Sequence, residues 1–400
     1  MKPSEKLGDN IIATSGIAPF FGVANGAEIG LSAPENRKGD AVRCWVASLS
    51  GFQKEALVVS ARSGLMWRFV SDEGAYLNGH NEAPCPLAFL TTGMISSYMN
   101  EITALAARQG VELRKLRLIQ DNFYTMKGSM RKRTMTGGAL PVELEVEVDC
   151  DLDDGALNQL LADAIHASPL NGLMRGKLPS LFTLTKNGAP LATAEAEQLD
   201  APPVPDPTGA DPKATATDLT LIERHGMTPK KAIQGGTAGA ATSLTDEQDR
   251  TLNPGAICTM GEDGLKVIEQ RLYSPHGNIF RFLSDEAPGA GGQGRAPDAV
   301  SLISAGIGFC FMTQFGRMAS MEGLDLPRYS IVQDTHFSLG GASGGTGEAG
   351  TADPVETHVH LITKESDDTT RDMLDVSERT CFLHAFCRTD LKTKLKVTRV

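Results

Sequence analysis

The sequence predicts an α+β protein that consists of two tandem copies of one domain, related by a pseudo-twofold axis. Two observations predict it: residue patterns recur at a constant spacing, and each recurrence contains a long apolar segment followed by strand-like alternation. The chain has 400 residues, two to three times the length of a typical domain. Each copy is therefore expected to hold a sheet packed on a long apolar central helix and on a second helix.

The repeat is carried by a heptapeptide and by matches that continue from it without a gap. Residues 67–73, WRFVSDE, recur at 280–286 as FRFLSDE, a spacing of 213 residues. At this spacing the segment 66–187 matches 279–400, whereas the residues before each segment match weakly. Identical pairs include Gly93 and Gly306, Met99 and Met312, and Asp154 and Asp367. Chance does not hold one register over so long a stretch, so we interpret the pattern as a tandem duplication.

The same spacing divides the chain into domains. Counting back from Val400 ends the first copy at Asn187. We expect domains at 1–187 and 216–400 and a linker at 188–215. The linker contains APPVPDP at 201–207, a composition that favours extended, semi-rigid chain. Two glycine-rich loops are expected at 235–241 and 288–292.

Within each copy the expected order is strands, a long helix, strands, a second helix and a last strand. The long helices are Leu87–Gly110 and Val300–Gly323, each closed by a glycine suited to the left-handed C-terminal position. Alternating apolar residues predict strands at 142–148 and 355–361. The second helices are expected to begin after Asp153-Asp154 and Asp367-Asp368, because acidic residues favour a helix N-terminus.

Composition excludes several functional classes. A net charge of −11 and a pI near 5.3 argue against nucleic acid or anionic lipid as the main partner. No run of about 18 or more apolar residues stands out to span a bilayer, and the N-terminus lacks the layout of a secretory signal, so we expect a cytoplasmic protein. Seven cysteines without regular spacing fit a reducing compartment in which one pair could still cycle.

The informative residues are those that break the repeat. Ser97 aligns with Cys310, and Ser168 aligns with Cys381. The two members of each pair are 71 residues apart. Two cysteines in one copy and two serines in the other indicate that each pair acts as a unit. The alternative is that both cysteines are small buried hydrophobic residues, the usual role of a free cysteine.

The second copy resembles the osmotically inducible protein C / organic hydroperoxide resistance (OsmC/Ohr) family. The residues that carry the resemblance are AGIGFC at 305–310 on an apolar helix and ERTC at 378–381 on a later one, with the SDE at 284–286 before them. In the first copy, Ala167-Ser168-Pro169 resembles the Cys-Pro of the family with serine in place of cysteine. Family members are intertwined homodimers, so the resemblance implies a dimer made covalent, which could pair further into a homodimer of fused chains.

The resemblance also implies a mechanism and the residues that perform it. Cys310 would be the peroxidatic thiolate, which attacks a hydroperoxide and becomes a sulfenic acid, and Cys381 would resolve it into a disulfide that a dithiol reductant reopens. The family places an arginine held by a glutamate over the cysteine, and here the acidic position is Val300. Because an apolar helix disfavours a thiolate, a cation must be supplied. Arg295, which is specific to the cysteine-bearing copy, is the preferred candidate. The other candidates are Arg281 and Arg43.

Three further groups have two interpretations each. His336, His358 and His360 could hold a metal ion, but the counterparts Glu145 and Glu147 favour a solvated polar face. His384 could accept a proton from Cys381 or be incidental. Cys387 is a minor alternative to Cys381, and the other cysteines are treated as non-catalytic. We expect neither a metal nor a cofactor.

The function predicted first is thiol-dependent reduction of a small hydrophobic organic hydroperoxide. One alternative is a single-cysteine hydrolase or transferase that uses Cys310 on another small electrophile. The other is a non-enzymatic OsmC-like protein that binds a small ligand between the copies. A hydroperoxide titration separates the three, because only the first function consumes two thiols per chain.

Overall fold

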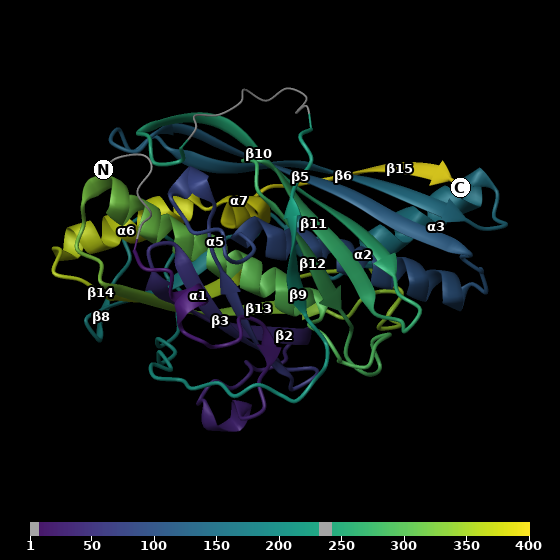
Figure 1. The fold of residues 1–400 in the computed structure, drawn as a ribbon, viewed down its shortest axis with the longest axis horizontal. Helices are drawn as coiled ribbons and strands as arrows, with labels where there is room; N and C mark the ends of the chain where they lie inside the picture. Colours follow the sequence, from purple (N-terminus) through teal and green to yellow (C-terminus); the bar gives the residue numbers. More distant parts are fainter. Residues whose placement is uncertain (1–7, 232–241) are drawn as a thin grey trace.

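The computed structural model describes residues 8–231 and 242–400 and places the long helices between two β-sheets (Figure 1). In these residues the α-helices are α1 (Ile11–Thr14), α2 (Pro86–Arg108), α3 (Asp154–Ala167), α4 (Leu170–Arg175), α5 (Ala299–Glu322), α6 (Asp367–Thr380) and α7 (Phe382–Arg388). The first sheet has the order β1 (Phe21–Gly22), β4 (Met66–Ser71), β3 (Gln53–Ser60), β2 (Gly39–Ser50), β13 (Arg328–Ser338), β14 (Val355–Ile362), β7 (Ser180–Lys186) and β8 (Ala189–Leu191). The second has the order β15 (Thr393–Arg399), β6 (Thr136–Asp149), β5 (Lys115–Ser129), β10 (Glu247–Met260), β11 (Lys266–Ser274), β12 (Asn278–Ser284) and β9 (Ile222–Met227).

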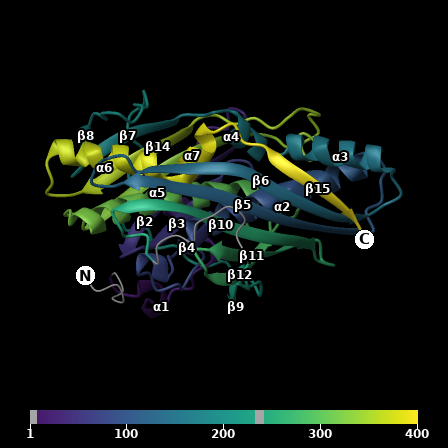
Figure 2. The same ribbon diagram turned by 90° about the horizontal axis from the view of Figure 1, so that it is seen from above.

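Both sheets contain strands from both halves of the chain. In the first sheet β2 pairs with β13, and in the second β10 pairs with β5. The last strand of each half lies in the sheet that holds the other half's first strands on a parallel neighbour: β7 pairs with β14, and β15 pairs with β6. In Figure 2, yellow β15 accordingly runs beside blue β6, although they are far apart in sequence. Neither half can complete a sheet without the other.

The two halves carry the same order of elements in the same register. His358 pairs with Thr183 in the first sheet, and Glu145 pairs with Lys396 in the second. Both members of one pair lie at the 213-residue spacing from members of the other. The expected order of strands, long helix, strands, helix and last strand is present in each half.

The equivalence reaches the N-terminal strands, where the sequences match weakly. Gln333 on β13 faces Cys44 on β2, and Gln120 on β5 faces Ala256 on β10. Gln120 and Gln333 keep the 213-residue spacing, whereas Cys44 and Ala256 are one residue closer. A single-residue shift therefore conceals the correspondence from an ungapped sequence comparison.

The two long helices pack directly on each other. A Cβ on Gly93 of α2 would lie 2.7 Å from the carbonyl oxygen of Ala299, and a Cβ on Gly306 of α5 would lie 2.7 Å from the backbone nitrogen of Leu90. These contacts run in opposite order along the two chains, so the helices are antiparallel. Glycine permits the close backbone approach. Gly323 ends α5 in the left-handed conformation, as predicted, with φ of 69°.

Helix α5 is long and apolar enough to cross a membrane, which the sequence analysis did not recognise. In the structure 94% of its most apolar stretch is buried. Cα neighbours from α2, α6 and both sheets surround it, and it lies in the main hydrophobic core. Its composition is therefore that of a core helix covered on all sides.

The second helices begin close to where the acidic residues predict. Asp153 caps α3 by accepting a hydrogen bond from the Ala156 backbone, whereas Ser366, one residue before the predicted acidic pair, caps α6. The short helices α4 and α7 were not predicted. Of the two predicted loops, 288–292 is a loop and 235–241 lies outside the described residues.

The segment 188–215 contains β8 and otherwise crosses the first sheet as extended chain and turns. Asp206 fastens it, because its carboxylate accepts hydrogen bonds from Trp45 Nε1 at 2.7 Å and from Ser330 Oγ at 2.8 Å. The Val204 carbonyl lies 3.0 Å from His360 Nε2. The proline-rich segment is thus held against β2, β13 and β14.

Candidate active site

The two cysteines singled out by the repeat lie on neighbouring helices and touch. Cys310 lies in the middle of α5, and Cys381 follows the last residue of α6 and caps α7. Cys310 is 2% exposed and Cys381 is fully buried. Their thiols are hydrogen-bonded to each other, and both cysteines are free. The structure brings the predicted pair together.

The equivalent serines form the same contact in the other half. Ser97 Oγ on α2 lies 2.7 Å from Ser168 Oγ, at the end of α3. Both serines are buried. Each hydroxyl therefore satisfies the other, as each thiol does at the cysteine pair. This matched geometry explains why the two positions change together.

Cys381 is the more deeply sealed member of the cysteine pair. Its sulfur accepts a hydrogen bond from the His384 backbone at 3.5 Å, at the start of α7. Burial, and next the hydrogen bond with Cys310, raise the pKa of Cys381 well above that of an ordinary thiol. Cys381 is therefore held as a neutral thiol at neutral pH, which suits it to react second.

Cys310 opens onto a small cavity that both halves line. The cavity has a volume of about 30 Å³, enough for a water molecule. Its apolar walls include Leu252, Leu272 and Phe382. An organic substrate would need some of these side chains to move. Because Cys381 does not line the cavity, Cys310 is the thiol that an entering molecule meets first.

A buried carboxylate from the first half reaches this cavity. Glu73 accepts hydrogen bonds from Tyr76 at 2.5 Å and from Thr313, three residues after Cys310 on α5, at 3.0 Å. Burial raises the pKa of Glu73, and the ammonium of Lys54 opposes that rise. Lys54 is itself fully buried and donates to the Phe52 carbonyl at 2.5 Å. An acid and a base are thus enclosed beside the reactive helix.

Two buried guanidinium groups line the same cavity without a carboxylate hydrogen-bonded to either. Arg317 is 1% exposed, and it donates to the Ser243 carbonyl at 2.9 Å and to the sulfur of Met135 at 3.0 Å. Arg250 donates to the Ser243 hydroxyl, and its Nε has no partner in the described residues. Burial lowers the pKa of Arg317 to about 9 and that of Arg250 to about 10, so both remain charged at neutral pH.

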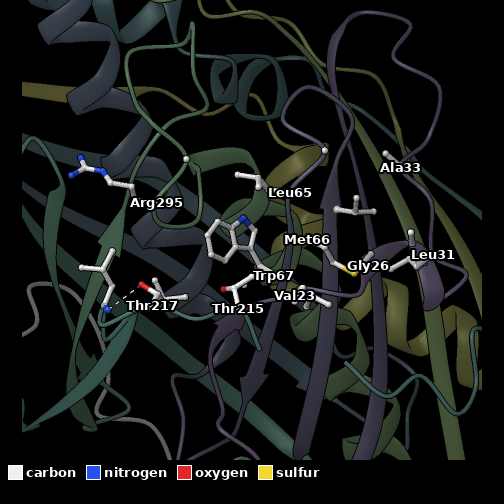
Figure 3. A pocket seen from close by; sticks show the side chains of 18 of the residues that line it. Val23, Gly26, Leu31, Ala33, Leu65, Met66, Trp67, Thr215, Thr217 and Arg295 are labelled. Atoms are coloured by element: carbon white, nitrogen blue, oxygen red, sulfur yellow. Dashed lines mark hydrogen bonds between the residues drawn. The ribbon is translucent and has the colours of Figure 1, made fainter. Parts of the chain in front are cut away.

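Arg295, the cation preferred from sequence, lies elsewhere. Its Nε donates to Asp285 at 3.1 Å and its Nη2 donates to the Asp263 carbonyl at 3.0 Å. Its side chain borders a separate groove beside Trp67 (Figure 3) and does not line the Cys310 cavity. The other candidates are also engaged outside it: Arg43 pairs with Asp334, and Arg281 lies opposite Glu269 on β11. Arg317 and Arg250 take the place expected for Arg295.

The sequence carried a signal for Arg317 that the analysis missed. Arg317 lies seven residues after Cys310, hence on the same face of α5. Its equivalent in the other half is Ala104, so the arginine occurs only beside the cysteine pair. The criterion that selected Cys310 also selects Arg317. Arg250 gave no such signal, because the one-residue shift makes its equivalent Lys38, another cation.

A further thiol also lines the cavity. Cys85, treated as non-catalytic from sequence, is the N-cap residue of α2. Burial, and next the charge of Glu73, raise its pKa to about 12. Its equivalent in the other half is Asp298, the N-cap of α5. Burial likewise raises the pKa of Cys387 to about 12.

The histidines have structural surroundings. His358 Nδ1 lies 2.9 Å from the Thr183 hydroxyl. His384 packs between Phe182 and Phe311, and burial lowers its pKa to about 3. Its two ring nitrogens have no partner in the described residues. His384 is therefore a neutral imidazole in an aromatic cluster at neutral pH.

Comparison with known proteins identifies the class of the C-terminal part. Residues 292–396, which hold both cysteines, match the model of the OsmC-like protein family. This segment is an OsmC-like domain. Among solved structures the chain is similar to an OsmC-like hydroperoxide resistance protein from Jannaschia sp. CCS1, with 16% identity over 33% of this chain and 81% of that one and a TM-score of 0.19. No curated protein matches the chain.

Proposed function

We propose that this protein is a two-cysteine peroxidase that reduces organic hydroperoxides. The observation that carries the proposal is the direct contact of the Cys310 and Cys381 thiols beside a cavity with two buried guanidinium groups. The OsmC-like family includes hydroperoxide resistance proteins, which supports the same chemistry. The neutral serine pair marks the other half as the scaffold.

In the first step the anionic sulfur of Cys310 attacks the O–O bond. The terminal oxygen is transferred to sulfur as a sulfenic acid, and the alkoxide leaves as the alcohol after it takes up a proton. Arg317 and Arg250 would stabilise the sulfur anion and the departing oxygen, because charges interact strongly where water is excluded. Glu73 has hydrogen bonds from Tyr76 and Thr313 and balances part of this positive charge.

In the second step Cys381 attacks the sulfenic sulfur. A disulfide forms, and the hydroxyl leaves as water with the thiol proton of Cys381. The contact between the sulfurs means that little movement is needed for this step. An external dithiol then reduces the disulfide by exchange.

We also propose that the chain arose by tandem duplication of an OsmC-like domain, with units at 1–187 and 216–400 joined by the linker 188–215. The equal order of elements and the equivalent strand pairings support this. On this view each strand exchange within the chain corresponds to an exchange between the subunits of a dimer. One unit kept the thiols, and the other kept the structure that completes their cavity.

A thiol count after hydroperoxide treatment tests the enzymatic proposal. Reduced protein is titrated with cumene hydroperoxide, and the free thiols are counted. A peroxidase of this kind loses two thiols per equivalent, and Cys310→Ser abolishes the loss. Adding Ser97→Cys to the Cys310→Ser protein should restore little, because Ser168 supplies no resolving thiol. A loss of one thiol or none would favour the single-cysteine enzyme or the binding protein instead.

A further inference from the structure

A second, larger hollow lies at the edge of the first sheet, away from the cysteines (Figure 3). It has a volume of about 1170 Å³ and shares no lining residue with the Cys310 cavity. Residues 22–33 form one wall, the start of β4 forms the floor, and residues 215–221 form the opposite wall. We call it the Trp67 groove. A space of this size accommodates a ligand of drug or lipid-chain dimensions.

The floor and walls of the Trp67 groove are apolar. Met66 and Trp67 contribute side chains that are 6% exposed, and Leu31 contributes one that is 5% exposed. Leu65 remains 36% exposed at the edge, although it is a large apolar residue. A ligand that covered Leu65 and filled the groove would gain the free energy of removing this surface from water.

One polar group in the groove lacks a partner. The indole nitrogen of Trp67 donates no hydrogen bond to any described residue, although a buried tryptophan usually finds an acceptor. It is also absent from the sealed atoms without partners, so the N–H reaches the open space of the groove. The equivalent residue in the other half is Phe280, which packs in the core and has no donor. The unpaired donor is specific to this groove.

The charged residues that border the groove do not favour an ionic ligand. The guanidinium of Arg295 is neutralised by Asp285, and in Figure 3 it points away from Trp67. Asp218 is exposed at the rim, where water screens its charge. The interior therefore offers an apolar surface and one hydrogen-bond donor.

We propose that the Trp67 groove binds a neutral, elongated apolar molecule that carries one hydrogen-bond acceptor oxygen. The apolar chain lies along Met66 and Leu31, and the oxygen accepts the Trp67 N–H. The site is independent of the peroxidase chemistry, since no residue is shared between the groove and the cavity.

Binding of 1-octanol to the full chain tests this proposal. The chain has two tryptophans, so Trp45→Phe leaves Trp67 as the only fluorophore. We expect a saturable change in Trp67 emission with 1-octanol, and binding of octanoate and octylamine at least several-fold weaker. By calorimetry, Trp67→Phe should weaken octanol binding roughly fivefold, because one hydrogen bond is lost. The fold should accept this change, since phenylalanine occupies the equivalent position 280.

Leu65→Glu is the second variant, and it places a charge in the groove from an exposed position. It should abolish octanol binding while leaving cumene hydroperoxide consumption unchanged. The proposal is overturned if octanol gives no saturable signal, if both variants bind octanol as the parent does, or if octanoate or octylamine binds more tightly than octanol. A loss of peroxide consumption in Leu65→Glu would contradict the independence of the two sites.

Discussion

Arg317 and Arg295 differ in what neutralises each guanidinium. Arg295 has the carboxylate of Asp285, whereas Arg317 has a carbonyl and thioether sulfurs. A buried cation without a hydrogen-bonded carboxylate can act on a nearby anion, and a paired one is largely cancelled. Arg317 is therefore the residue at which a charge change should affect Cys310.

We predict that Arg317→Gln slows oxidation of Cys310 by about tenfold or more, since a tenfold change corresponds to only about 1.4 kcal/mol of lost stabilisation. The rate constant is measured by stopped-flow with cumene hydroperoxide. Arg295→Gln is the matched control and should react at the parental rate. The opposite result, a slow Arg295 variant and a normal Arg317 variant, would return the activating role to Arg295.

The resolving role of Cys381 gives a second prediction. Cys381→Ser should consume one equivalent of hydroperoxide and then stall as a sulfenic acid at Cys310, because a serine hydroxyl does not displace it. Dimedone labelling and mass spectrometry detect the trapped species. Turnover at the parental rate without added thiol would support the single-nucleophile alternative. A new internal disulfide to Cys85 or Cys387 would transfer the resolving role to that thiol.

At the level of elements, the crossing of α2 and α5 depends on glycine. A Cβ at position 93 would lie 2.7 Å from the Ala299 carbonyl oxygen and 3.0 Å from the Ile303 nitrogen, and backbone atoms cannot move aside cheaply. We predict that Gly93→Ala lowers the free energy of unfolding by about 2 kcal/mol. Urea unfolding measures it. Gly155→Ala, in the exposed first turn of α3, is the control and should be neutral or slightly stabilising. Equal effects would show that the crossing tolerates a methyl group.

The N-cap of α5 makes stability depend on pH. Burial, and next the charges of Glu286 and Asp40, raise the pKa of Asp298 from 3.8 to about 7. A carboxyl whose pKa is raised on folding contributes stability below its unfolded value and loses that contribution as pH rises through its folded value. The wild-type protein should therefore lose stability between pH 4 and pH 7.

Asp298→Asn should remove this dependence and keep the cap, because asparagine also caps helices well. We predict that the variant gains about 1 kcal/mol or more relative to the wild type between pH 5 and pH 8, measured by urea unfolding. Asp153→Asn, at the exposed N-cap of α3, is the control. A difference between wild type and variant that does not change with pH would contradict the prediction.

For the whole molecule, the exchanged strands make the halves interdependent. Without the second half, β7 and β6 lose their parallel partners, and β5 loses β10. We predict that 1–187 and 216–400 expressed separately do not fold, and that together they form a complex of the mass of one chain. Circular dichroism and size-exclusion chromatography check this. A cooperative unfolding transition from either half alone would show that the proposed units fold independently.

Local sequence determined the elements of the fold and the pair of residues at its centre. The apolar segments that became α2 and α5, the alternating strands of β6 and β14, and the Cys310 and Cys381 exchange with serine were all legible in the chain, because periodicity and repeats are properties of sequence. The C-terminal likeness to the OsmC-like family was legible for the same reason.

Only the tertiary structure decided which charges surround Cys310. Glu73 comes from the first half and Arg250 from β10, and both reach α5 because the sheets combine strands of both halves. Arg295 is close to Cys310 in sequence, yet Asp285 holds it in another groove. Electrostatic interactions depend on distance in space and on burial, which the exchange of strands sets and sequence spacing does not record.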